Sequence, residues 1–319
     1  MPRPLATLLL AALGSLAQAS PAPSVRVGAL AFGTLGWELA IIRSRGLDQA
    51  QGIAIEATEL ASPEAGRIGL QGRSLDIVVS DWLWTARQRQ QGQPLSFAPF
   101  STSHGALVVP RDSAVKDVAD LRGKRLGIAG GGLDKNWLLL KTLAQQTQQL
   151  DLEKSATLSF GAPPLLNQQL EHGQLDAVLT YWNYAAKLEA QGYRELLDGR
   201  QLQKRLGIDA DVPVLGYVFR EDWAKANPQA VDGFLKAAAE ARQRICESDA
   251  DWQQVVPLTR EPDSQAQAML RRHYCAGRWP AAASIPSTAA QTLFDRINAA
   301  AGEPAAAIPA GTFWSAPKP

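Results

Sequence analysis

Short aliphatic runs alternate along the chain with longer stretches in which apolar residues recur at helical spacing. The run 25–30 is followed by Leu35, Leu39 and Ile42, which share one helical face before Gly46. Strand-like runs separated by amphipathic helices are typical of a mostly parallel α/β sheet. The same pattern predicts further strands over 53–60, 75–79, 95–100, 106–109, 125–129, 157–160 and 177–180, and an extended run over 212–219.

The last third of the chain has a more helical pattern. Pro228 precedes a stretch in which Val231, Phe234, Leu235, Ala238 and Ile245 lie on one helical face, and this predicts a long amphipathic helix. Strands therefore come first, a self-contained α/β unit follows, and strands and helices then return. We predict two lobes joined by two hinge crossings: residues 20–107 and 214–319 form lobe 1, and residues 108–213 form lobe 2.

The first 19 residues predict export. Arg3 is followed by an apolar run from Leu5 to Leu16 and by the small-residue site Ala17-Gln18-Ala19, the order of a secretory signal peptide. The alternative is a short buried helix. We expect a signal peptide over 1–19 that is cleaved near Ala19, and a soluble mature protein in the periplasm.

Composition narrows the partners. The 319 residues include 32 Lys and Arg against 31 Asp and Glu, so the chain offers no charge asymmetry for nucleic acid or an anionic membrane. Cys246 and Cys275 are the only cysteines, and in an oxidising compartment they are expected to form a disulfide, with two free thiols as the alternative. The three histidines are scattered and no Cys-x-x-Cys pair occurs, so we expect no metal site and no cofactor.

Four segments carry a family resemblance: Phe32 to Trp37, Leu75 to Asp81, Val118 to Ile128 and Leu166 to Ala177. In order and spacing they resemble the nitrate/sulfonate/taurine and thiamine-precursor (NMT1-like) group of periplasmic substrate-binding proteins of ABC importers. The resemblance implies a type II periplasmic-binding-protein fold, in which each lobe is a mostly parallel sheet flanked by helices. It also implies ligand contacts on the loops that follow the strands.

Topology selects the same loops, because ligands of open α/β sheets bind at the carboxyl ends of the strands. The predicted ligand-binding residues are Thr34, Trp37, Ser80, Asp81, Trp82, Thr102, Ser103, Gly131, Asp134, Trp137, Tyr181, Trp182 and Asn183.

Tryptophans are concentrated on these loops, and their flat faces suit stacking on a ring or enclosing a cation. For each one, core packing is the alternative, and at most one of Trp82 and Trp84 can face the cleft because residues two apart do not share a helical face.

Few basic residues are expected at the cleft, because Lys135 and Arg67 are interpreted as surface residues. Gly130 to Gly132 could form an anion cradle, but a flexible turn capped by Asp134 is the competing interpretation. We therefore favour an aromatic or amine-bearing ligand over a sulfonate.

Catalysis is not expected. Ser103 and His104 are adjacent on an extended run and point to opposite faces, and the chain has no Gly-x-Ser-x-Gly elbow. The sequence favours a monomer that captures a small organic ligand and delivers it to an ABC permease in the inner membrane. Two alternatives stay open: an enzyme on the same fold, pyrimidine-synthase-like or dehydratase-like, and a periplasmic sensor subunit.

Overall fold

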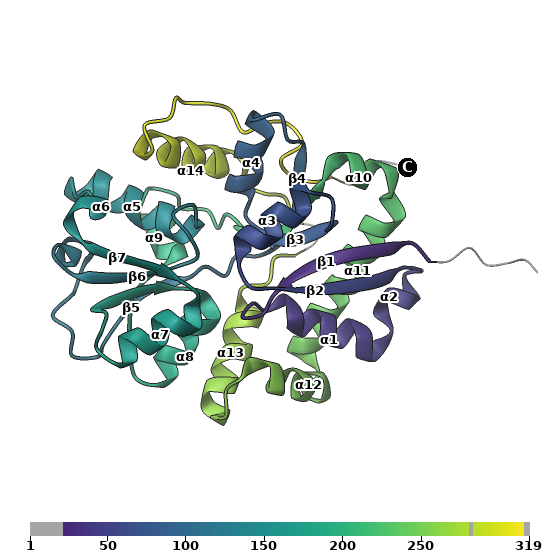
Figure 1. Cartoon of the computed structure of the whole chain (residues 1–319), viewed down its shortest axis with the longest axis horizontal. Helices are drawn as coiled ribbons and strands as arrows, with labels where there is room; N and C mark the ends of the chain where they lie inside the picture. Colours follow the sequence, from purple (N-terminus) through teal and green to yellow (C-terminus); the bar gives the residue numbers. More distant parts are fainter. Residues whose placement is uncertain (1–21, 281–282, 316–319) are drawn as a thin grey trace, which may run out of the picture.

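The structure, a computed structural model, describes residues 22–280 and 283–315, so the predicted signal peptide lies outside the described residues. Figure 1 shows two α/β lobes side by side. The first lobe is built on a sheet with the strand order β2-β1-β3-β10-β4, and the second lobe on a sheet with the order β7-β6-β8-β5-β9. The strands of the first lobe are β1 (Ser24–Leu30), β2 (Ala54–Leu60), β3 (Ile77–Ser80), β4 (Leu95–Ser101) and β10 (Leu215–Arg220). Those of the second are β5 (Ala106–Val109), β6 (Arg125–Ala129), β7 (Thr157–Gly161), β8 (Ala177–Thr180) and β9 (Arg194–Asp198).

In each sheet one strand is antiparallel to both of its neighbours. In the first lobe β1, β2 and β3 are parallel, and β10 is antiparallel to β3 and β4. In the second lobe β6, β7 and β8 are parallel, and β5 is antiparallel to β8 and β9. The prediction of two mostly parallel sheets is therefore confirmed.

Helices cover the sheets of both lobes. The first lobe carries α1 (Leu35–Arg45), α2 (Leu47–Ala50), α3 (Pro63–Gln71), α4 (Trp82–Gln90), α10 (Glu221–Ala226), α11 (Pro228–Glu247), α12 (Asp249–Thr259) and α13 (Ser264–Ala276). The second carries the 3₁₀ turn η1 (Val118–Leu121), α5 (Lys135–Gln148), α6 (Leu152–Ser155), α7 (Pro163–Glu171), α8 (Trp182–Ala190) and α9 (Gly199–Arg205). The expected apolar face of α11 is buried at Val231, Phe234, Ala238 and Ile245, and it packs near β1 and α1. Among the described residues, no helix combines the length and hydropathy that a membrane crossing requires.

The chain crosses between the lobes after β4 and again before β10. Strand β5 pairs wholly with the second sheet, so Ala106 and Leu107, which the prediction placed in lobe 1, belong to that sheet. The remaining lobe boundaries stay a prediction. Gly105 lies in the first crossing, where a Cβ would come 2.2 Å from the carbonyl oxygen of Thr180, so only glycine fits this approach.

Helix α14 (Ser287–Ala300) connects the two lobes a third time. It leaves the first lobe, packs against α5 of the second lobe, and contacts α4 through a Phe294–Trp82 pair with ring centroids 6.1 Å apart. The chain then returns to β4, where the backbone nitrogen of Phe97 donates to the oxygen of Thr312 at 2.7 Å. Leu293, Phe294 and Ile297 are almost completely buried, and exposing each would cost about 1.5–3 kcal/mol. Separating α14 from its neighbours would therefore be costly. The sequence had assigned this helix to lobe 1 alone.

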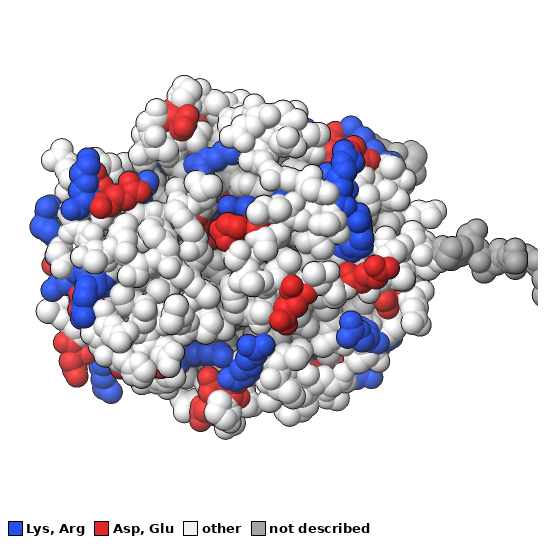
Figure 2. All heavy atoms as spheres, in the orientation of Figure 1, with Lys and Arg blue, Asp and Glu red and all other residues white. Residues whose placement is uncertain are grey.

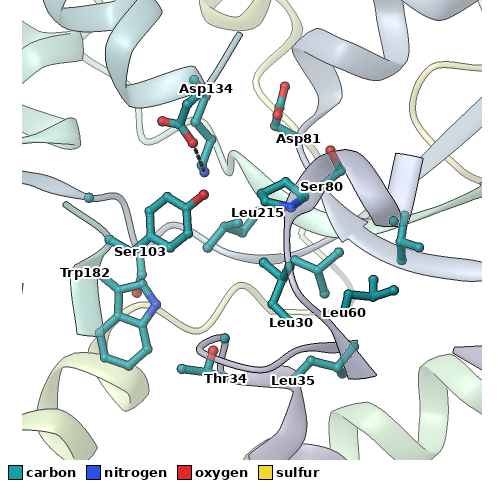
Figure 3. Close-up of a pocket in the computed structure, with 18 of the residues that line it drawn as sticks. Leu30, Thr34, Leu35, Leu60, Ser80, Asp81, Ser103, Asp134, Trp182 and Leu215 are labelled. Atoms are coloured by element: carbon teal, nitrogen blue, oxygen red, sulfur yellow. Dashed lines mark ion pairs between the residues drawn. The ribbon is translucent and has the colours of Figure 1, made fainter. Parts of the chain in front are cut away.

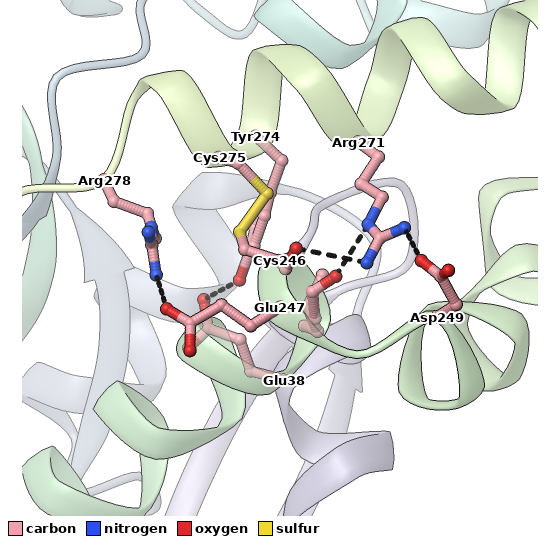
Figure 4. The surroundings of a disulfide bond; sticks show 9 residues. Glu38, Cys246, Glu247, Asp249, Arg271, Tyr274, Cys275 and Arg278 are labelled. Atoms are coloured by element: carbon pink, nitrogen blue, oxygen red, sulfur yellow. Dashed lines mark hydrogen bonds and ion pairs between the residues drawn. A yellow bond between two sulfur atoms is a disulfide. The ribbon is translucent and has the colours of Figure 1, made fainter.

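A disulfide fixes α13 to α11 (Figure 4). Cys246 and Cys275 are joined, which is the pairing that the sequence favoured, and Arg271 donates to the carbonyl oxygens of Ile245 and Cys246 at 3.0 and 3.1 Å. The segment after α13 then pairs with the first crossing, because the nitrogen of Thr102 donates to the oxygen of Gly277 at 2.8 Å. The disulfide thus anchors the element against which the crossing rests.

Removing the disulfide is expected to destabilise the first lobe. In a Cys246→Ser/Cys275→Ser double variant the free energy of unfolding should fall by about 3 kcal/mol, because the bond closes a loop with a separation of 29 residues. Urea denaturation measures the change. As a control, a thiol reductant should destabilise the wild type and leave the double variant unaffected. Equal midpoints for the two proteins would contradict the expectation.

Candidate functional site

A pocket lies between the lobes, at the carboxyl ends of β1, β3, β6 and β8 (Figure 3). It encloses about 900 Å³ of atom-free space, open solvent included. The pocket is lined by Gly28, Leu30, Gly33, Thr34, Leu35, Leu60, Pro63, Gly66, Arg67, Val78, Val79, Ser80, Asp81, Phe100, Ser103, Gly105, Asp134, Lys135, Asn136, Tyr181, Trp182, Asn183 and Leu215. Its size suits a small organic molecule.

Two aspartates occupy equivalent positions in the two lobes. Asp81 caps α4 by accepting a hydrogen bond from the nitrogen of Trp84 at 2.8 Å, and Asp134 caps α5 by accepting one from the nitrogen of Asn136 at 2.8 Å. Capping explains both positions, since Asp is a preferred residue at a helix N-terminus. It occupies one carboxylate oxygen of each aspartate, and both side chains line the pocket.

Two basic side chains lie beside these carboxylates. Arg67 Nη2 is 3.6 Å from Asp81 Oδ2, and Lys135 Nζ is 3.9 Å from Asp134 Oδ2. Both bases are largely buried, with side-chain exposures of 14% and 10%, and Nε of Arg67 is buried without a hydrogen-bond partner among the described residues. The interpretation of Arg67 and Lys135 as surface residues is therefore wrong. Each lobe contributes one acid and one base to the pocket.

Burial disfavours the charged form of Asp134. Desolvation raises the pKa of its carboxyl group, and the nearby charge of Lys135 opposes the shift. Desolvation also raises the pKa of Tyr181, which stays a neutral hydroxyl at the pocket wall. The polar end of the pocket therefore holds a carboxylate that a cation would stabilise.

The other end of the pocket is apolar. In Figure 3 Leu30, Leu35 and Leu60 lie together, away from Asp81 and Asp134. The side chain of Trp182 faces the same cavity from the second lobe. A ligand with a polar head and an apolar body matches this division.

Eight predicted site residues line the pocket: Thr34, Ser80, Asp81, Ser103, Asp134, Tyr181, Trp182 and Asn183. The other five do not: Trp37, Trp82, Thr102, Gly131 and Trp137. Thr102 pairs instead with Gly277, and Gly131 lies against Glu64 of the first lobe, whose Oε1 would be 3.1 Å from an added Cβ.

The predicted convergence of tryptophans on the pocket is wrong for Trp37, Trp82 and Trp137. Trp82 is completely buried beside Phe294 and Phe313, and Trp137 is completely buried beside Phe160. Trp82 follows the capping Asp81 by one residue, and Trp137 follows the capping Asp134 by three. In both cases the aspartate lines the pocket and the indole packs in the core. Trp84 also leaves the pocket lining and packs under Arg67, with the guanidinium 5.0 Å from the ring centroid.

Trp37 contacts Trp182, which lines the pocket, but Trp37 itself does not line it. Their rings are nearly perpendicular with centroids 6.0 Å apart. Glu38, the residue after Trp37, is also buried, and its carboxylate accepts hydrogen bonds from Tyr274 at 3.0 Å and from Arg242 at 3.2 Å. It supports the first lobe and does not line the pocket.

The structure adds residues that the sequence reasoning missed. Besides the two bases, these are chiefly apolar: Leu30, Leu35, Leu60, Phe100 and Leu215. Leu30 and Leu60 are the last residues of β1 and β2. The rule that ligands bind at the carboxyl ends of strands could therefore have selected them, had it been applied to apolar residues as well as polar ones. Arg67 follows Pro63 by one helical turn, and both line the pocket, a spacing that could have placed it there.

Ser103 and His104 do not form a catalytic pair. His104 is buried with its Nε2 atom 3.0 Å from Nε2 of Gln203, and burial lowers its pKa to about 3. Such an imidazole stays neutral throughout the ordinary pH range and contacts Gln203, while Ser103 lines the pocket.

Comparisons with known proteins place this architecture in a class. A protein from Bordetella bronchiseptica RB50 is 18% identical with a TM-score of 0.74, over 92% of this chain and 94% of that chain. The alkanesulfonate-binding protein SsuA from Xanthomonas axonopodis pv. citri, bound to MOPS, is 19% identical with a TM-score of 0.71, over 93% and 99%. The periplasmic nitrate-binding protein NrtA from Synechocystis PCC 6803 is 15% identical with a TM-score of 0.56, over 73% and 65%. The fold is thus the two-lobed periplasmic-binding-protein fold.

The family follows from the sequence. A family model described as NMT1/THI5 like matches residues 43–250, so the chain belongs to the NMT1/THI5-like family. No curated protein matches the sequence.

The raised pKa of Asp134 has a consequence for stability. A carboxyl group whose pKa is higher in the folded protein costs stability as pH rises through the window from its ordinary value to the folded value, and the full cost remains at higher pH. Asp134→Asn keeps a capping oxygen and removes the charge, so it should raise the free energy of unfolding at neutral pH, with the gain disappearing in acid. Urea denaturation at several pH values measures both.

Asp151→Asn is the matched control. Asp151 also caps a helix, but a hydrogen bond from Lys154 lowers its pKa, so its charge is favourable and the variant should gain no stability at neutral pH. A loss of stability in Asp134→Asn at neutral pH would contradict the prediction that the buried charge of Asp134 destabilises the folded protein.

Proposed function

We propose that this protein is the periplasmic solute-binding component of an ABC importer, which captures a small organic ligand between its lobes as a monomer and delivers it to an inner-membrane permease. The family, the two-lobed fold and the signal-like N-terminus support this function. Similar structures carry the names of alkanesulfonate-binding and nitrate-binding proteins, which supports capture over catalysis.

The ligand that fits best is a small zwitterion with an apolar segment. The observation that carries this proposal is the charge balance of the pocket, where each lobe supplies one carboxylate and one base. An ammonium group between Asp81 and Asp134 would relieve the cost of keeping Asp134 charged. An acidic group on the same ligand would use the donors of Arg67 and Lys135.

This proposal keeps the amine that the sequence favoured but no longer disfavours a sulfonate on the same ligand. The sequence disfavoured a sulfonate because Arg67 and Lys135 were interpreted as surface residues. In the structure both of these basic side chains line the pocket. The aromatic lining is limited to Phe100, Tyr181 and Trp182, so the apolar body of the ligand would pack mainly on leucines. Both charge signs are also interspersed over the face of the molecule in Figure 2, so the ligand would be selected inside the pocket and not by a surface field.

Three probes of equal chain length separate the possibilities: an aminoalkylsulfonate, an alkylsulfonate and an alkylamine. Isothermal titration calorimetry should give the tightest binding for the aminoalkylsulfonate. Asp81→Asn should weaken binding of that probe about 10- to 100-fold, since a hydrogen bond to a charged group contributes about 1.5–3 kcal/mol.

The same variant supplies the control, because Asp81→Asn should not weaken binding of the alkylsulfonate, which lacks the ammonium group. Tight binding of the alkylsulfonate with no gain from an added amine would overturn the zwitterion. Absence of any co-purified small molecule in native mass spectra, together with no binding of any of the three probes, would count against solute capture itself.

A further inference from the structure

Helix α8 of the second lobe is docked along its length on the first lobe. Near its start, Asn183 Nδ2 donates to the carbonyl oxygen of Phe32 at 3.1 Å. Near its end, Lys187 Nζ donates to the carbonyl oxygen of Thr259 at 2.6 Å, and Glu189 pairs with Nε2 of His273 at 3.1 Å. These three contacts join one helix to the turn after β1, the end of α12 and the face of α13, which lies beside α8 in Figure 1.

Trp182, the first residue of α8, links this docking to the pocket. Its indole lines the pocket and also packs on two rings of the first lobe: Trp37, with centroids 6.0 Å apart, and Tyr274, with centroids 6.1 Å apart. In Figure 3 Trp182 and Thr34 lie on the same side of the cavity, from opposite lobes. A movement of α8 away from the first lobe would therefore open the pocket wall between these two residues.

The two sides of the lobe boundary differ in what separation would expose. On the α14 side, Leu293, Phe294 and Ile297 are almost fully buried, so opening there would bring a large apolar surface into water. On the α8 side the apolar contacts are smaller: the buried Ala186 and the partly buried indole of Trp182 pack on the first lobe. The other contacts of α8 are the three polar ones, and the His273–Glu189 pair is already 39% and 38% exposed. Separation is therefore easier on the α8 side, with α14 and the two crossings as the pivot.

We propose that α8 is a latch: its docking on α12 and α13 holds the lobes closed, and its release opens the pocket on the side of Trp182 and Thr34. The role of this opening in ligand entry rests on the proposed function, whereas the latch itself is a property of the protein without ligand. Lys187 is a positioning residue here, because it lies outside the pocket lining and acts only through the docking of α8.

Double electron–electron resonance on the ligand-free protein tests the latch. Spin labels at Leu165→Cys on α7 and Leu258→Cys on α12 lie in different lobes at exposed positions. The labels attach selectively because the two native cysteines are bonded to each other. In this background Lys187→Met should shift the label distances to longer values and broaden their distribution, since it removes the donor to Thr259 and keeps the length of the side chain.

Lys141→Met is the matched control. Lys141 donates to Glu153 at 3.0 Å within the second lobe, so its loss removes a lysine contact of similar length without touching the lobe boundary, and the distances should stay as in the parent. A parental distance distribution in Lys187→Met would overturn the latch.

Folding is checked by thermal denaturation. If Lys187→Met does not fold, His273→Ala tests the same contact line at a position that is 39% exposed, with the same shift expected and the same parental result overturning the proposal. Because these distances need no ligand, they separate a failure of the latch from a failure of the zwitterion titrations.

Discussion

The architecture of the pocket depends on where the chain crosses between the lobes. Both crossings lie at the facing carboxyl edges of the sheets, so the strand that follows each crossing, β5 or β10, must run away from that edge. This explains why these are the strands that oppose their neighbours in the two sheets. It also explains the tight packing at Gly105, where a Cβ would lie 2.2 Å from the oxygen of Thr180. The crossings therefore contribute to the pocket lining, through Ser103 and Gly105 in the first and through Leu215 after the second.

The contact energies on the α14 side and the α8 side of the lobe boundary are unequal. Exposing Leu293, Phe294 and Ile297 of α14 would cost about 1.5–3 kcal/mol each. On the α8 side, a hydrogen bond such as the one from Lys187 contributes about 0.5–1.5 kcal/mol net, and a half-exposed ion pair about 0–1 kcal/mol. Each ring contact of the partly buried Trp182 adds about 0.5–1.5 kcal/mol. A protein of two lobes with one strong and one weak junction has a preferred direction of opening. That direction leads to the side of the pocket where Trp182 and Thr34 lie.

Much of the fold followed from the sequence, because the buried strands are short aliphatic runs with turn residues at both ends. The strands over 106–109, 125–129 and 177–180 agree with β5, β6 and β8 at both ends. Strand β9 (Arg194–Asp198) was missed because it is an edge strand with charged residues among its few apolar ones. Helix α12 was missed as well, and Pro257 inside it removes the usual helical pattern. In the site, the loops could be predicted from topology, but side-chain directions could not, because they depend on which residue caps each helix.

Capping also explains how this pocket acquires its charges. An aspartate at the N-terminus of α4 or α5 satisfies a backbone nitrogen with one oxygen. Its other oxygen lies near a base that also lines the pocket, Arg67 for Asp81 and Lys135 for Asp134. Burial there is unfavourable for the charge, as the raised pKa of Asp134 indicates, so the free protein retains an electrostatic cost. A cationic group placed between the two aspartates would remove that cost only when the lobes are close together. The charges whose burial costs free energy would then favour closure around a ligand, so that ligand binding and the position of the lobes would be coupled.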